Sequence, residues 1–287
     1  MKKLHFILAL VFVLVLHACN SQKQESKNND SPTVISSYFG QKPPGITPEV
    51  FAPSVVSTEE HCETEVLFLP GMTEFSFNRL GGENNEPSKL IVMEYKDHNW
   101  SKKPVPLSDI DDYKERFSPS FKELNNLEPF RDIPIIGGAL SAKGTYYFYV
   151  LDLSDGKGYM SYSRLINGKY ETPQKMSNAI NRGKYIAHPF IAPDESYLMW
   201  DAEKEDENIP DIYISFRKKD GSWGTAINMG DKINTPLYEQ RPKVTPDGKY
   251  LTFWRGNFKT KEDGSRYLLG NPYWMDAKVI KDLRPKE

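Results

Sequence analysis

The sequence lacks a block of basic residues. Its 37 Lys and Arg are balanced by 39 Asp and Glu, which gives a formal charge of -2 at pH 7, and the basic residues are spread along the chain. A protein that binds nucleic acid normally shows a clustered positive patch. We therefore expect no nucleic-acid partner.

The sequence also lacks the short motifs of common enzyme classes. It contains no G-x-S-x-G, H-E-x-x-H, C-x-x-C or phosphate-binding loop. The acidic segment 201–211, "DAEKEDENIPD", offers oxygen ligands for calcium but lacks the glycine and spacing of an EF-hand loop, which favours a solvated hairpin. The sequence thus predicts no cofactor, no metal site and no identifiable catalytic residue.

Long apolar runs are absent beyond the N-terminus, which itself has the layout of a signal peptide. "MKK" is a short positive region, "LHFILALVFVLVLHA" is an apolar core, and small Ala18 precedes Cys19. The segment "LHAC" at 16–19 resembles the lipobox of bacterial lipoproteins. That resemblance implies a signal peptide at 1–18, cleavage before Cys19, and a lipid on the Cys19 thiol. An ordinary secretory signal or an uncleaved anchor is the alternative.

The lipoprotein interpretation implies attachment to a membrane of the cell envelope, periplasmic or outer. Residues 19–45 begin with the polar stretch "NSQKQESKNND", which cannot bury enough apolar surface to fold, and they are predicted to be a flexible tether. Only Cys62 then remains, so no intramolecular disulfide can form. Cys62 beside His61 could be a nucleophile or metal ligand, but a thiol at a strand end is favoured because no further ligand completes a site.

The remaining residues, 46–287, favour an all-β domain. They contribute most of the 16 Tyr, 15 Phe and 5 Trp and of the 21 Pro and 19 Gly, which suits short strands joined by tight turns.

One pattern recurs along this domain. "HPFIAPDESYLMW" at 188–200 is nearly repeated by "RPKVTPDGKYLTFW" at 241–254, and Trp200 lies 52 positions after Phe148 and 53 before Phe253. Each period holds a strand such as "YLTFW", which we take as the inner strand, a second strand such as "DIYISF", and a "KDGSW" turn. About four antiparallel strands repeated around an axis make a propeller blade.

The period breaks in the first half of the chain. Phe77, in the early copy "LFLPGMTEFSFNR", lies 71 positions before Phe148, too far for one period and too near for two. Residues 101–140 therefore form either a degenerate blade or a long insertion, and the blade number stays open between four and six.

The two ends of the domain complement each other. The last copy stops after "PYWMDAKVI", whereas residues 50–71 parallel 227–248, the segment that this copy lacks. We therefore expect strands near 246–254, 272–280 and 48–56 to share one sheet, so that the N-terminal strand closes the ring and removes an open edge.

These segments resemble the Pro-Asp-type, WD-like repeats of TolB-like β-propeller lipoproteins of Bacteroidetes-type bacteria. The resemblance rests on "APDESYL", "TPDGKYL" and "DIYISFRKKDGSW" and covers roughly residues 38–287. It implies a six-bladed propeller in the cell envelope, with residues 101–140 as the departure.

Aligning the repeats places Thr64, Gly137, His188 and Arg241 at equivalent positions, hence near one mouth of the central channel. His188 and Arg241, with Glu63 and Glu239 close by, could bind an anionic sugar or a peptide carboxylate. The alternative is that these groups cap strand ends and bind water.

Two function classes follow. The first is a non-catalytic, lipid-anchored binding or scaffolding module for an envelope protein or glycan, which we expect to be monomeric. The second is a glycan-active lyase or hydrolase that uses the channel mouth. The lack of a clear acid/base pair favours the first.

The anchor can be tested directly. Cys19→Ser should abolish lipidation, because only a thiol accepts the diacylglycerol group. Metabolic labelling with a radioactive fatty acid measures this, and equal label in wild type and variant would contradict the lipoprotein assignment.

Overall fold

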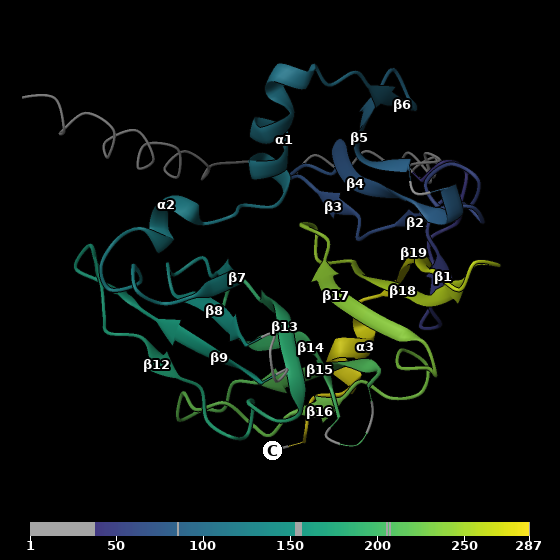
Figure 1. Cartoon of the computed structure of the whole chain (residues 1–287). Coiled ribbons are helices and arrows are strands. Elements are labelled where there is room, and N and C mark those ends of the chain that lie inside the picture. The colour runs from purple at the N-terminus through teal and green to yellow at the C-terminus, as the bar shows by residue number, and fades with distance from the viewer. Residues whose placement is uncertain (1–37, 85, 153–156, 205, 207, 287) are drawn as a thin grey trace, which may run out of the picture. The chain divides into compact units, whose positions relative to one another are not determined.

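The structure is a computed structural model that describes residues 38–84, 86–152, 157–204, 206 and 208–286 (Figure 1). The predicted signal peptide, Cys19 and the tether up to residue 37 lie outside the described residues. Tyr38 packs edge-on against Trp274, with ring centroids 4.9 Å apart, and Gln41 hydrogen-bonds the backbone of Val50. The folded region thus includes residues before the predicted boundary at 46.

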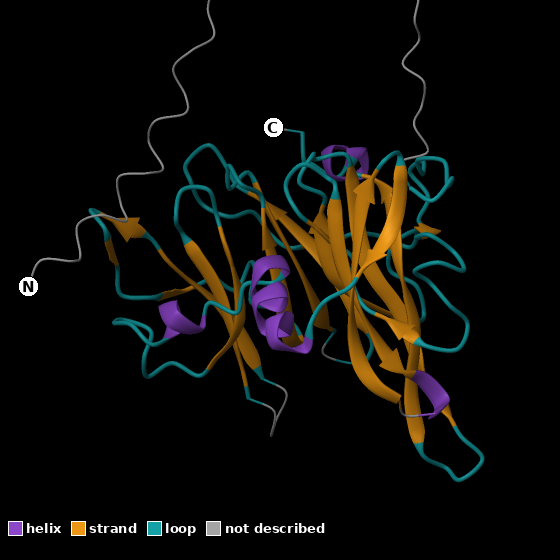
Figure 2. Ribbon diagram, turned by 90° about the horizontal axis from the view of Figure 1, so that it is seen from above, coloured by secondary structure: helices purple, strands orange, loops and turns teal. Residues whose placement is uncertain are grey.

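The described chain is mostly β-strand, as predicted, and its few helices are short (Figure 2). None of the helices in the described ranges is long and apolar enough to cross a membrane. The helical elements are η1 (Gly82–Asn84), η2 (Leu107–Asp109), α1 (Ile110–Phe117), α2 (Lys122–Asn125) and α3 (Lys278–Asp282).

The strands form four antiparallel groups, here called sheets I to IV. Sheet I contains β2 (Cys62–Glu63), β3 (Leu67–Phe68), β4 (Glu74–Gly81), β5 (Glu86–Lys96) and β6 (Asn99–Lys103). Sheet II contains β7 (Ile135–Leu140), β8 (Tyr146–Leu151), β9 (Gly158–Ser163) and β12 (Gln174–Lys175). Sheet III contains β13 (Lys184–Ile191), β14 (Tyr197–Glu203), β15 (Pro210–Phe216) and β16 (Ile227–Asn228). Sheet IV contains β17 (Tyr238–Val244), β18 (Tyr250–Thr260), β19 (Arg266–Asp276) and β1 (Glu49–Val50).

Two details complete this topology. A single parallel pair, Gly270 with Cys62, joins sheets IV and I into one nine-stranded sheet. The small hairpin of β10 (Leu165–Ile166) and β11 (Lys169–Tyr170) extends from sheet II.

Both faces of sheets III and IV are buried, which explains their apolar strands. Alternate residues of a strand point to opposite faces. In β18, Leu251 and Phe253 enter the core shared with sheet III, whereas Tyr250 enters the core shared with sheet I. In β14, Leu198 packs toward sheet II and Met199 toward sheet IV. Consecutive sheets thus pack face to face, each across its own core.

The predicted pairing of the chain ends is confirmed. β1 pairs with β19 through Glu49–Trp274 and Val50–Tyr273, and β19 pairs with β18 along its whole length. Phe51, directly after β1, contacts Trp274 of sheet IV and Phe75 of sheet I, with ring centroids 5.1 and 5.7 Å away. The N-terminal strand therefore completes sheet IV and fixes it to sheet I.

Residues 101–140 do not form a sheet of their own. β6 ends at Lys103 as the outer strand of sheet I, and the helical segment 107–125 follows, before β7 starts at Ile135. Phe121 and Phe130 of this insertion pack on Tyr146 of sheet II. The long-insertion alternative describes this region, and the six-bladed count is not confirmed, because the described residues provide four sheets.

The order of strands within each sheet differs from the prediction in one respect. "YLTFW" lies in β18, the second strand of its sheet, and the edge strand is β17. β13 packs against both β7 and β17, so these edge strands face one another where the sheets meet. The turn before "YLTFW" is thus not the innermost point of the repeat.

An Ile-Asn pair recurs at 180–181 and 233–234, and its asparagine has a structural role that was not predicted. The side chain of Asn234 accepts a hydrogen bond from the Ile212 backbone N–H (2.8 Å) and donates one to the Ile212 carbonyl (2.9 Å). Asn181 forms the same two bonds with Met160 in sheet II, at 2.7 and 3.1 Å. These amides attach the segment between two sheets to the third strand of the preceding sheet.

Phe51 provides a test of the closure. Phe51→Ala should lower the free energy of unfolding by about 3–5 kcal/mol, because it opens a cavity between sheets IV and I. Urea denaturation measures the change. The half-exposed Phe258, 40% accessible, is the matched control. Equal losses for Phe51→Ala and Phe258→Ala would show that the N-terminal segment does not stabilise the fold.

Candidate functional site

The facing edge strands share a backbone irregularity. The pairing register shifts between Ala187 and Phe190 in β13, and between Gln240 and Lys243 in β17. At these bulges His188 has φ 49° and Arg241 has φ 59°. A bulge re-aims a side chain, and left-handed φ values are uncommon for residues other than glycine. The strained backbone thus places His188 and Arg241 at corresponding points of two neighbouring sheets, as predicted.

The carboxylate of Asp201 connects these two residues. Asp201 is 1% exposed, and its Oδ2 atom lies 2.9 Å from Nδ1 of His188 and accepts a hydrogen bond from the Arg241 backbone N–H at 3.0 Å. A carboxylate oxygen accepts, so Nδ1 of His188 is the donor in this contact. In the sequence, Asp201 is identifiable only as a possible calcium ligand of the acidic segment 201–211.

Arg241 also reaches sheet I, where it meets Glu65. Its Nη1 lies 3.2 Å from Oε1 of Glu65, with side-chain exposures of 40% and 11%. The aligned repeats predict that Thr64 is equivalent to Arg241, but the equivalent residue is Glu65, the next one along the chain. The equivalent ion pairs Glu63–Arg79 and Glu239–Arg255 show that Glu65 holds the corresponding position.

Two further groups lie beside these residues. Together they form what we call the central cluster: Glu65, Tyr149, His188, Asp201, Arg241 and Lys243. Burial raises the pKa of the Tyr149 hydroxyl to about 12; Arg241 opposes this effect, and the carboxylates of Asp201 and Glu65 add to it. Burial lowers the pKa of the Lys243 amine against the attraction of Glu65, while the like charge of Arg241 lowers it further. The backbone of Lys243 pairs with β18, but its amine forms no direct hydrogen bond or ion pair with the described residues.

Lys243 lines a cavity of about 400 Å³. The walls come from the ends of β3, β7 and β17 and from the insertion, which contributes Phe117 and Phe121. Phe68 and Leu140 add apolar surface. A mostly apolar cavity with one amine whose pKa is lowered has the properties of a small-ligand site.

The two predicted glutamates have a structural role instead. Glu239 is fully buried, and its oxygens accept hydrogen bonds from the Thr235 N–H and hydroxyl and from Nε of Arg255 at 2.7 Å. Burial raises the pKa of Glu239 in spite of these contacts. The same arrangement recurs at Glu63 with Thr58 and Arg79. Because their oxygens are occupied and screened from solvent, neither carboxylate is placed to receive a ligand.

The other sequence candidates do not form a site. Cys62 is buried, and burial raises the pKa of its thiol to about 12, which disfavours the reactive thiolate. In the acidic segment, Asp201 faces His188, whereas Asp211 pairs with Lys204. No group of three or more potential ligands among His, Cys, Asp and Glu gathers anywhere in the described residues.

Comparisons with known proteins give only distant likenesses. No family model matches the sequence, and no curated protein matches it. A solved prolyl endopeptidase is 13% identical over 73% of this chain and 29% of its own, with a TM-score of 0.31. The tricorn protease is 10% identical over 77% of this chain and 20% of its own, with a TM-score of 0.32.

A third similar structure is regucalcin from Agrobacterium tumefaciens, described as a calcium-binding protein. It is 11% identical over 74% of this chain and 76% of its own, with a TM-score of 0.32. The present chain spans less than a third of the length of the first two proteins. Likenesses of this strength assign neither a family nor an activity to the chain.

The electrostatic character of Lys243 can be measured. Because burial disfavours the ammonium form, the amine should titrate below the ordinary lysine value of about 10.4. NMR of ¹³C-lysine-labelled protein follows the Cε shift against pH, and Lys243→Arg assigns the resonance by removing it. A Lys243 resonance that titrates at the ordinary value would show that the amine is solvated.

Proposed function

We propose that the protein is a lipid-anchored, non-catalytic binding module of the bacterial cell envelope, with a propeller of the TolB-like type. The lipobox-like "LHAC" segment supports the anchor, and the recurring Pro-Asp turns support the propeller. The face-to-face packing of sheets II, III, IV and I, with the N-terminal strand in sheet IV, agrees with a ring of blades. The insertion between sheets I and II occupies the position where further blades were expected.

The observation that carries the binding function is the cationic group beside the cavity. Arg241 and Lys243 lie on one strand, and Lys243 borders an apolar space of about 400 Å³. Its size is within the range of small-ligand pockets, roughly 300–1,000 Å³. A ligand with a carboxylate and an apolar part would satisfy both sides of this site. The end of a peptide from an envelope protein, or an acidic glycan, has this chemistry.

Within the central cluster, Lys243 is the group to which a ligand has access. Glu65 pairs with Arg241, and Asp201 holds His188, so among the described residues the amine of Lys243 is the cation of this cluster without a direct partner. An anionic ligand would give the amine a partner in a partly buried setting, where such pairs are stronger than in water.

A second candidate function, a glycan-active enzyme, is favoured by one feature. Asp201 orients His188 through Nδ1, as a carboxylate orients a histidine that acts as general base. Glycosidases, however, need two available carboxyl groups, and here Asp201 is buried under His188 while Glu65 is paired with Arg241. Binding without turnover therefore fits the central cluster better.

The proposal predicts a loss of binding in a variant with both Arg241→Gln and Lys243→Gln. Glutamine at 241 keeps a hydrogen-bond donor for Glu65, so the fold should hold. Loss of a charged hydrogen bond costs about 1.5–3 kcal/mol, so the two changes should weaken the binding of the partner captured from envelope extracts about a hundredfold. Surface plasmon resonance with the captured partner gives the affinity.

The control is a variant with Lys114→Gln and Arg131→Gln, which alters the same residue types on exposed positions. It should bind as the wild type does. Full affinity in the central variant, at an unchanged melting temperature, would exclude the central site. Turnover of an envelope glycan by the wild type that His188→Gln abolishes would favour the enzyme instead.

A further inference from the structure

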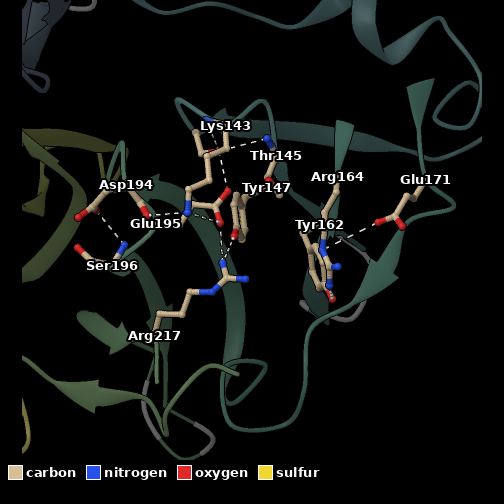
Figure 3. A network of polar contacts seen from close by, with 11 residues as sticks. Lys143, Thr145, Tyr147, Tyr162, Arg164, Glu171, Asp194, Glu195, Ser196 and Arg217 are labelled. Carbon is tan, nitrogen blue, oxygen red and sulfur yellow. Dashed lines mark hydrogen bonds and ion pairs between the residues drawn. The ribbon is translucent and has the colours of Figure 1, made fainter. Parts of the chain in front are cut away.

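A second cleft lies away from the central cluster, between sheet II and the β15–β16 hairpin of sheet III. Its volume is about 280 Å³. Tyr147 and Tyr162 of sheet II form one wall, and Trp223 of the hairpin forms the other. Figure 3 shows Arg164 beside Tyr162, with the guanidinium of Arg217 directed toward Tyr147 and Glu195. None of these residues lines the central cavity.

The cleft is positively charged, although the chain has a formal charge of -2. Arg164, Lys175 and Arg217 line it, and Glu195 is the lining residue of opposite sign, while Glu171, outside the lining, lies 3.9 Å from Arg164. Cations gathered on a chain of net negative charge attract anionic ligands locally. The cleft therefore favours an anion.

The backbone of Glu195 is strained at this cleft. Its φ angle is 63°, and the equivalent turn residues of sheets II and IV, Gly144 and Gly248, have φ 82° and 73°. Glycine adopts this left-handed conformation freely, whereas it is energetically unfavourable for a glutamate. Strained residues of this kind mark functional positions more often than ordinary turns do.

The side chain of Glu195 explains why glycine is not used there. It is 4% exposed, accepts a hydrogen bond from the Ser141 hydroxyl at 2.8 Å, and pairs with Nη1 of Arg217 at 2.6 Å. The same Nη1 donates to the Tyr147 hydroxyl at 3.3 Å. Glu195 thus positions Arg217, whose hydrogen bonds to side chains of the described residues all leave from Nη1, so that the other edge of the guanidinium is available to a ligand.

Aromatic faces accompany both arginines. The Arg217 guanidinium lies 5.5 Å from the Trp223 ring centroid, and the Arg164 guanidinium lies 5.5 Å from that of Tyr162. The rings are half-buried, so part of each remains accessible. A planar guanidinium fork matches a carboxylate, and a flat aromatic face suits an apolar ring face.

We propose that this cleft binds an acidic sugar residue, a hexuronic acid within a glycan. The carboxylate pairs with Arg217 and Arg164, and the C–H face of the pyranose ring packs on Trp223 and Tyr162. Glu195 is a positioning residue, because it acts through Arg217. This site is independent of the central one and gives the protein a second point of contact with an acidic glycan.

The test is isothermal titration calorimetry on the full chain with disaccharides of galacturonate, glucuronate and mannuronate. At least one should bind, and its neutral counterpart with hydroxymethyl groups should bind at least tenfold more weakly. Arg217→Gln and Arg164→Gln should each weaken the acidic disaccharide about tenfold or more. The variant with Lys114→Gln and Arg131→Gln, which alters exposed residues outside both sites, should bind it as the wild type does.

The role of Glu195 is tested by a double-mutant cycle. Glu195→Gly, which relieves the turn, should weaken binding, and adding it to Arg217→Gln should cause no further loss, because it acts through that residue. An additive loss would overturn the positioning role. Failure of all three disaccharides to bind, equal binding of neutral and acidic forms, or tighter binding of inorganic phosphate than of the disaccharides would overturn the sugar assignment.

Discussion

The centre of this protein depends on one buried carboxylate. Asp201 accepts hydrogen bonds from the side chain of His188 in its own sheet and from the backbone of Arg241 in the next. A buried charge is tolerated only when it is paired, so these two donors must stay where they are. The left-handed bulges at His188 and Arg241 follow from this requirement, because a regular strand would aim both groups elsewhere.

Much of the fold could be predicted because large aromatic residues that are buried in the core recur at the period of the repeat. Trp200 and Phe253 are buried at equivalent points of sheets III and IV, so their spacing reports the repeat directly. The insertion at 104–134 could not be predicted as helical. Its packing depends on tertiary contacts such as that of Phe130 with Tyr146, which no local pattern of the sequence reveals.

The central site was predicted in part, for an equally physical reason. His188 and Arg241 occupy equivalent positions, and symmetry brings such residues together. Lys243 carries no sequence signal, because its character comes from burial beside Arg241. The aligned repeats predicted Thr64 at this position in place of its neighbour Glu65. The 16-residue spacing shared by Glu63–Arg79 and Glu239–Arg255 would have corrected the register, since both are the same buried ion pair.

The pairing of β1 with β19 also bears on when the protein folds. Its two strands are more than 200 residues apart, so sheet IV cannot be completed until β19 has been synthesised. Contacts this distant in sequence form late and slowly, because the intervening chain must first be ordered. The proposed export of the protein as an extended polypeptide would benefit from such a delay, because sheet IV cannot be completed before β19 has left the translocation channel.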